Sequence, residues 1–229
     1  MRVPLLGFYT SNILSIGGIT VITAKVISNG IEGLDEHMFR PNEQISYDFA
    51  EVTESFNPQL EGFDLLIVPN GSDQVAMLKI KDRVNAFLEA GNALFCFDGW
   101  FTNWIPGNQW IMDNSQKTID IRYRIKTDRY HLFDDVDVKS LNFSHGISGW
   151  WACGYIKAAE GADVVMVDTW ERPMIVLDEV STNGTMILTA SGPVADYTYA
   201  TTDDKDSMQD IGKLYRNFLT LIENKKVTS

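Results

Sequence analysis

Short apolar runs alternate with amphipathic segments along much of the chain, and this alternation predicts an α/β fold. Asp64–Val68 (DLLIV) and Ala93–Phe97 (ALFCF) are continuous apolar runs, which is the pattern of buried parallel strands. Between them, Lys79–Ala90 has apolar residues at helical spacing and is followed by Gly91, a common helix stop. We therefore expect two adjacent parallel strands whose carboxyl ends share one rim of the sheet, where ligands bind in folds of this class.

The first fifty residues predict three further elements. Val3–Tyr9 is a short apolar run that reads as a first strand. Apolar positions three and four residues apart then predict a helix from about Ile16 to Ile27, stopped by an Asn-Gly pair. A second strand is expected near Phe49–Val52.

The second half of the chain is richer in strands. Thr118–Lys126 alternates between apolar and polar residues, and Ala162–Val167 is an apolar run. Met174–Glu179 and Thr185–Ala190 are joined by a Ser-Thr-Asn-Gly turn, which predicts a hairpin. Ile211–Glu223 has the spacing of an amphipathic helix.

Together these elements predict a flavodoxin-like three-layer α/β sandwich with a mostly parallel central sheet and a late β-hairpin. At 229 residues without an internal linker, we expect one domain over 1–229. No apolar run approaches 18 residues, so we expect no transmembrane helix. The start lacks an alanine-x-alanine cleavage site, so we expect no signal peptide. Two cysteines in apolar or aromatic stretches suit a reducing compartment, so the expected location is cytoplasmic.

The chain is acidic, with 31 acidic and 19 basic residues and a net charge of −12. Such a surface repels phosphate backbones and anionic lipids. We therefore expect neither a nucleic acid nor a membrane as a partner.

The order of strands, turns and helices along the chain resembles that of class I glutamine amidotransferase-like domains. The nearest members are the ThuA-like and β-galactosidase trimerisation-type domains. Two runs carry the resemblance: Asp64-Leu-Leu-Ile-Val-Pro-Asn-Gly-Ser, followed by a helix, and Ala90-Gly-Asn-Ala-Leu-Phe-Cys-Phe-Asp-Gly-Trp. Two later segments are similar to parts of the ThuA-like branch, namely His131-Leu-Phe-Asp-Asp-Val-Asp and the hairpin from Arg172-Pro-Met to Asn183-Gly-Thr. The family implies the same fold as the pattern of elements does.

The resemblance also implies a site, and the chain departs from it. In that family the first turn lies beside the oxyanion site, and Asn70-Gly71 would occupy it here. The second turn is the nucleophile elbow, where working glutaminases have a cysteine with a late histidine. Here the elbow position is Asp98, Cys96 lies two residues earlier, and no histidine follows His145. Without a base the thiol has no route to activation, so a working glutaminase is excluded.

Asp98 and His145 are the catalytic candidates. Asp98 could act as a nucleophile, a general base or a metal ligand at the strand-to-helix turn, or it could cap the following turn. His145 lies in a loop rich in glycine and aromatic residues, where it could be an acid, a base or a residue that fixes the loop.

The ligand-binding candidates are the two turns at the rim and a tryptophan from the glycine-rich loop. Six tryptophans are present, and several lie in loops expected at the rim, where indole rings can stack on a sugar or fill loop space. We expect the following residues to line one cavity: Asn70, Gly71, Ser72, Gly99, Trp100 and Trp150. The expected ligand is a small molecule or carbohydrate.

No cofactor or metal is expected. Asp35, Glu36 and His37 are adjacent, so their side chains are expected to point in different directions, and a metal site there would need ligands from elsewhere in the chain. The acidic cluster Asp134-Asp135-Asp137 lacks the twelve-residue calcium-loop pattern.

Three functional hypotheses follow. The first is a non-catalytic amidotransferase-like domain for binding or assembly, with an aromatic pocket at the rim. The second is a hydrolase-type enzyme that uses Asp98 and His145 on a carbohydrate-derived substrate. The third is a homo-oligomerisation subunit without a ligand.

Overall fold

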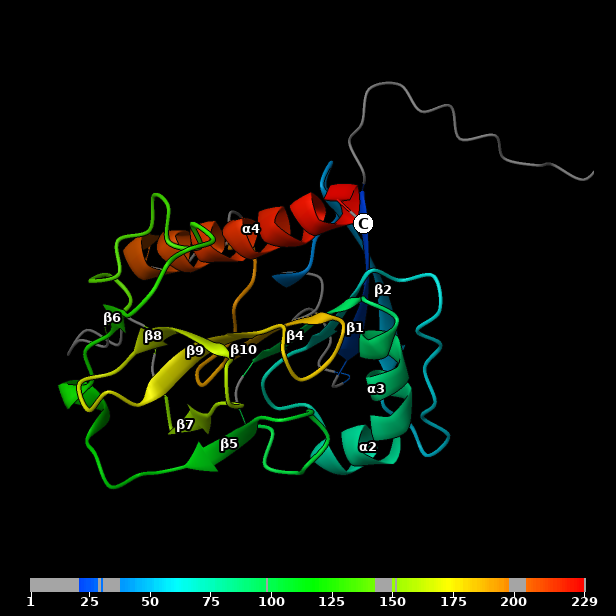
Figure 1. The fold of residues 1–229 in the computed structure, drawn as a ribbon, viewed down its shortest axis with the longest axis horizontal. Helices are drawn as coiled ribbons and strands as arrows, with labels where there is room; N and C mark the ends of the chain where they lie inside the picture. The colour runs from blue at the N-terminus through cyan, green and yellow to red at the C-terminus, as the bar shows by residue number, and fades with distance from the viewer. Residues whose placement is uncertain are drawn as a thin grey trace, which may run out of the picture.

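A computed structural model describes most of the chain between residues 21 and 228 (Figure 1). The described residues are 21–28, 30, 38–97, 99–142, 150, 152–197 and 205–228. The predicted strand Val3–Tyr9 lies outside them.

A mixed α/β fold is present, with a large eight-stranded sheet, helices on both of its faces and a second, two-stranded sheet. The strands of the large sheet run in the spatial order β2 (Ile45–Glu51), β1 (Ile22–Ser28), β3 (Leu65–Val68), β4 (Ala93–Phe97), β10 (Thr185–Thr189), β9 (Pro173–Asp178), β8 (Asp163–Val167) and β6 (Arg124–Ile125). Pairing is parallel from β2 through β10 and antiparallel from β10 to β6, so the sheet is mostly parallel with a late antiparallel hairpin.

The central βαβ prediction is confirmed. β3 and β4 pair in parallel, with Leu65 opposite Ala93 and Val68 opposite Cys96. Every residue of both strands is buried, which explains the continuous apolar runs. The predicted helix Lys79–Ala90 is confirmed as α3 (Lys81–Glu89), and a further short helix, α2 (Gln74–Lys79), precedes it.

The predicted helix over Ile16–Ile27 is wrong in its described part, because Ile22–Ser28 forms strand β1 between β2 and β3. Six of its seven residues are buried, so the apolar spacing does not reflect a single helical face. Its β-branched residues favour a strand. Lys25 is accommodated because its ammonium pairs with Asp48 of β2 at 2.5 Å.

The predicted strand Thr118–Lys126 is also too long. Its alternation is real, since Ile121 and Tyr123 are buried and their neighbours exposed. Only Arg124 and Ile125 pair with β8, and Thr118–Asp120 is a short 3-10 turn.

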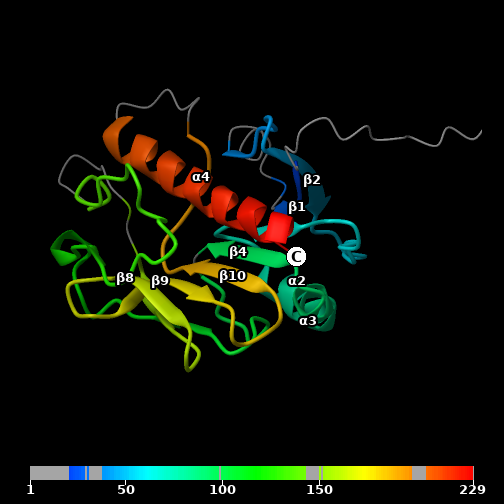
Figure 2. The same cartoon turned by 45° about the horizontal axis from the view of Figure 1, so that its top comes forward.

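Helix α4 (Lys205–Thr228) covers one face of the sheet, and α2, α3 and the small sheet lie on the other (Figures 1 and 2). The predicted helix Ile211–Glu223 lies within α4. Phe95 of β4 contacts Tyr215 and Phe218 of α4 edge-on, at centroid distances of 6.3 and 5.8 Å. The small sheet pairs β5 (Gln109–Met112) with β7 (Gly154–Lys157) in antiparallel fashion. No helix among the described residues is long and apolar enough to cross a membrane.

Candidate functional site

The carboxyl ends of β3, β4 and β10 meet at one rim of the sheet. Gly192, which follows β10, lies so close to its neighbours that a Cβ there would be 3.2 Å from the Cβ atoms of both Asn70 and Phe97. Ser191 also forms a bridge with Ala152. Segments that are far apart in the sequence are therefore brought together beside the first predicted turn.

That first turn, Asn70–Ser72, is held by its own hydrogen bonds. The hydroxyl of Ser72 donates to the carbonyl oxygen of Pro69 at 2.6 Å, and the side chain is buried. Gly71 is exposed and has a φ of +78°, a conformation that favours glycine. The hydroxyl of Ser72 thus closes the turn.

Gln74 joins this turn to the loop that follows β4. Its side-chain nitrogen donates to the carbonyl oxygen of Ser72 at 3.1 Å, and its side-chain oxygen accepts from Trp104 Nε1 at 2.8 Å. Thr102 Oγ1 donates to the Gln74 carbonyl oxygen at 2.8 Å. The first predicted turn is therefore connected to the loop after β4 through a buried glutamine that the sequence analysis did not single out.

Asp98 and His145 lie outside the described residues. Their pairing as an acid and a base stays a prediction. Cys96 is fully buried within β4, between Val68 of β3 and Leu188 of β10.

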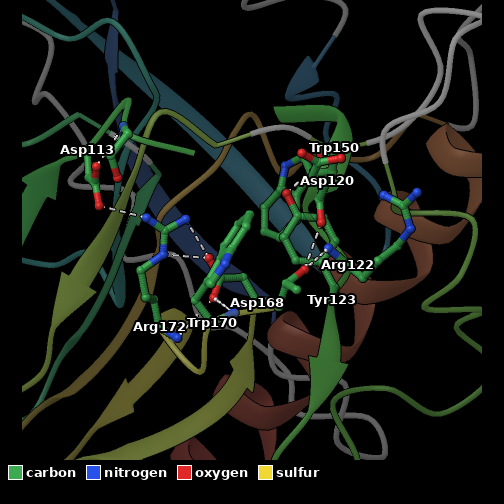
Figure 3. A network of polar contacts seen from close by, with 10 residues as sticks. Asp113, Asp120, Arg122, Tyr123, Trp150, Asp168, Trp170 and Arg172 are labelled. Atoms are coloured by element: carbon green, nitrogen blue, oxygen red, sulfur yellow. Dashed lines mark hydrogen bonds and ion pairs between the residues drawn. The ribbon is translucent and has the colours of Figure 1, made fainter. Parts of the chain in front are cut away.

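Trp150 is held from two sides. Its backbone N–H donates to the carbonyl oxygen of Leu141 at 2.7 Å, and its carbonyl oxygen accepts from the Tyr123 hydroxyl at 2.7 Å. The rings of Tyr123 and Trp150 lie 5.8 Å apart (Figure 3). Two residues further along the chain, Ala152 forms a bridge with Ser191 and so lies at the rim.

A cavity of about 230 Å³ lies between the loop after β4 and strand β5. Of the six residues predicted to line one cavity, Trp100 is among its lining residues, whereas Asn70, Gly71, Ser72, Gly99 and Trp150 are not. Its lining residues are Trp100, Phe101, Thr102, Asn103, Asn108, Gln109, Trp110 and Ile111. None of these carries a charge, in a chain whose net charge is −12. We call it the β4–β5 cavity.

Two buried indole N–H groups of this cavity lack an acceptor. Trp100 is 2 % exposed and Trp110 is 8 % exposed, and neither Nε1 has a hydrogen-bond partner within the described part of the chain. The Nε1 of Trp150, which does not line this cavity, also has no partner among the described residues. Trp104 in the same loop is the contrast, because its Nε1 donates to Gln74. A buried donor left unpaired costs about 1–3 kcal/mol.

The back of the cavity is rigidly built around Asn108. Its amide nitrogen donates to Asp178 Oδ2 at 2.5 Å and to the Pro106 carbonyl oxygen at 2.9 Å. Its side-chain oxygen accepts from the Ala159 backbone N–H at 3.0 Å. Asp178 is fully buried and also accepts from the backbone N–H of Ser181. Asn108 thus supports the cavity wall with its own hydrogen-bonding groups already engaged.

A second cavity, of about 240 Å³, opens at the opposite, amino-terminal ends of β3, β4 and β10. Its charged groups are paired: Lys226 Nζ lies 2.7 Å from Asp64 Oδ2, and Lys225 pairs with Glu179. Burial works to raise the pKa of Asp64, but hydrogen bonds from Lys226 and from Thr23 outweigh it and hold the pKa below its ordinary value. We call it the α4-end cavity, because Lys225 and Lys226 are the end of α4.

No group of three or more His, Cys, Asp or Glu side chains that could hold a metal ion occurs among the described residues.

Neither a protein-family model nor a curated protein sequence matches the chain. Among solved structures it is similar to cytoplasmic protein STM1381 from Salmonella typhimurium LT2, with a TM-score of 0.57 and 10 % sequence identity over 89 % of this chain and 99 % of that one. At this identity the likeness shows a shared fold alone.

Two larger enzymes are more remote matches. They are exo-β-1,4-mannosidase Op5Man5 from Opitutaceae bacterium strain TAV5 (TM-score 0.43, 8 % identity, 91 % of this chain and 34 % of that one) and Gan42B, a GH42 β-galactosidase from G. stearothermophilus (TM-score 0.45, 11 % identity, 91 % and 30 %). The chain spans about a third of either enzyme, and likenesses this remote carry no argument here.

Proposed function

We propose that this chain is an amidotransferase-like binding domain whose β4–β5 cavity takes a small neutral ligand, with carbohydrates as the class that fits best. The observation that supports this most is the pair of buried, unpaired indole donors, Trp100 Nε1 and Trp110 Nε1. An indole nitrogen only donates, so the ligand must present acceptor oxygens. Hydroxyl and ring oxygens of a sugar are such acceptors.

The remaining lining residues suit the same chemistry. Phe101 is 73 % exposed beside the cavity and offers a ring face for stacking. Asn103 and Gln109 are exposed amides that can both donate to and accept from hydroxyl groups. An uncharged lining neither attracts nor repels a neutral polyol, whereas a charged ligand would enter without a counter-charge.

The size of the cavity restricts the ligand. At about 230 Å³ it is smaller than the roughly 300–1,000 Å³ of sites for drug-sized molecules. A single sugar ring, or the terminal ring of a longer glycan, is therefore the expected occupant.

The test is a titration of purified protein with glucose, galactose, mannose and their disaccharides, followed by calorimetry and tryptophan fluorescence. Parallel titrations use Trp100→Phe and Trp110→Phe, with Trp104→Phe as the matched control. We expect binding by the parent and affinity at least about tenfold weaker, or about 1.4 kcal/mol, in the first two variants. Trp104→Phe should instead lose stability, because it leaves the buried Gln74 oxygen without its donor.

The proposal fails if no saccharide binds to the parent, or if Trp100→Phe and Trp110→Phe bind as tightly as the parent does. Hydrolysis of a glycoside that is abolished by Asp98→Ala would favour the enzyme hypothesis instead.

A further inference from the structure

The turn between β8 and β9, residues 168–172, is closed by one buried carboxylate. Asp168 Oδ1 accepts from the backbone N–H groups of Trp170 and Arg172 at 2.9 and 3.0 Å. The Asp168 N–H in turn donates to the Arg172 carbonyl oxygen at 3.0 Å. The turn therefore holds Arg172 in a fixed position at the start of β9.

The guanidinium of Arg172 bridges two carboxylates (Figure 3). Its Nε and Nη2 lie 2.7 and 2.6 Å from Asp168 Oδ2, and its Nη1 donates to Asp113 Oδ2 at 2.8 Å. The arginine side chain is only 14 % exposed. Solvent therefore screens these pairs less than it screens a surface ion pair.

Through these contacts Arg172 reaches both strands of the small sheet. Asp113 directly follows β5, and its N–H extends the β5–β7 pairing by donating to the Cys153 carbonyl oxygen at 3.0 Å. The guanidinium also lies 5.5 Å from the ring centroid of Tyr155 on β7. A single side chain from the turn before β9 thus contacts both Asp113, the residue after β5, and Tyr155 of β7.

Strand β5 needs such support because a two-stranded sheet is marginally stable alone. Its beginning is fixed by the hydrogen bonds of Asn108 to Asp178 and Ala159. Its end is fixed by the ion pair of Asp113 with Arg172. Between these two anchors lie Gln109 and Trp110, which line the β4–β5 cavity.

We propose that Arg172 is a positioning residue of the β4–β5 cavity, which anchors the end of β5 and so fixes the place of the Trp110 indole. The expected effect of Arg172 on ligand binding rests on the proposed function. The expected effect of Arg172 on the position of β5 does not depend on any ligand, so the two effects can be tested separately.

The experiment compares Arg172→Met and Asp113→Asn with Arg124→Met. Arg124 of β6 makes an ion pair with Glu171 of the 168–172 turn, and both side chains are more than half exposed. Each variant is measured by hydrogen exchange of the backbone amides and by titration with the saccharide that binds the parent. Arg172→Lys tests rescue, because a lysine keeps the charge but not the fork that spans both carboxylates.

In Arg172→Met and Asp113→Asn we expect the amides of 109–113 to exchange at least about tenfold faster, with β3 and β4 unchanged. Saccharide affinity should fall about tenfold in both, and Arg172→Lys should lie between them and the parent. Arg124→Met should match the parent in both measurements.

Parent-like exchange over 109–113 in Arg172→Met, or an affinity no weaker than that of Arg124→Met, overturns the proposal. If Arg172→Met does not fold, Asp113→Asn decides by the same criteria. The Asp113 side chain is the more exposed partner of the ion pair, so its substitution disturbs the fold less. Faster exchange over 109–113 together with a parent that binds no saccharide would leave the anchoring role intact and refute the proposed function.

Discussion

Two cavities of similar size, one at the amino-terminal ends of β3, β4 and β10 and one between the loop after β4 and strand β5, differ in how their polar groups are satisfied. The α4-end cavity of about 240 Å³ contains two lysines and an aspartate, and all three are paired. The β4–β5 cavity of about 230 Å³ contains no charge among its described lining residues, and two buried indole donors of these residues find no acceptor in the described part of the chain.

The difference separates a structural cavity from a candidate binding site. Where every polar group has a partner within the chain, as at the end of α4, the contacts are explained by the fold. Where buried donors lack partners, the fold alone leaves a free-energy penalty of about 1–3 kcal/mol each, which a ligand can remove. Volume does not distinguish the two cavities, but hydrogen-bond satisfaction does.

The largest expected effect comes from Gly154→Ala, which acts on the pairing of β7 with β5, the strand that lines the β4–β5 cavity. A Cβ at Gly154 would lie 2.2 Å from the Ile111 carbonyl oxygen and 2.9 Å from the Trp110 ring. Because a backbone atom must move, we expect the free energy of unfolding to fall by about 3 kcal/mol and saccharide binding to be lost. Chemical denaturation and titration measure the two effects.

The matched control at the other cavity is Gly91→Ala. Gly91 has a φ of +89°, and no atom lies within 4 Å of its Cβ position. The substitution should cost about 1–2 kcal/mol of backbone strain and leave binding unchanged. Parent-like stability of Gly154→Ala would show that β5 and β7 do not pair as described.

A smaller effect is expected from Lys226→Met, which acts on the α4-end cavity. It removes the ion pair with Asp64, whose side chains are 24 % and 23 % exposed, so stability at pH 7 should fall by about 1 kcal/mol. Saccharide affinity should not change. Urea unfolding of both proteins between pH 7 and pH 2 measures the difference.

The sign of the pH dependence follows from Asp64. Its pKa is lowered in the folded protein, so the stabilisation is present above the ordinary carboxyl pKa of about 3.9 and is lost as the pH falls through the folded value. The gap between parent and variant should therefore shrink as the medium is acidified below about pH 4. A gap that stays constant to pH 2 would contradict the assignment of the pair.

The central part of the fold could be predicted from the sequence because its strands are buried on both faces. Asp64–Val68, Ala93–Phe97 and the late hairpin needed only apolar runs and turn residues. β1 could not be predicted, because a continuous buried strand contains every spacing, including that of a helix. The small sheet was missed because β5 and β7 each have only four residues and come from distant segments.

The site could be predicted only in part. Trp100 and the Asn70–Ser72 turn follow the ends of adjacent parallel strands, so their place at the rim follows from topology. The missing acceptor of Trp110 depends on which segments surround it. The contact of Arg172 with Asp113 likewise depends on the position of β5, and no sequence spacing indicates either.

The central claim is that a bound ligand accepts hydrogen bonds from the indole N–H groups of Trp100 and Trp110, and side-chain NMR tests this claim directly. The indole resonances of ¹⁵N-labelled protein are assigned with the Trp→Phe variants and followed during saccharide titration. We expect the Nε1 protons of Trp100 and Trp110 to move downfield as they gain acceptors, while that of Trp104, already bonded to Gln74, stays in place. Saturable binding that leaves the Trp100 and Trp110 resonances unmoved would contradict the claim.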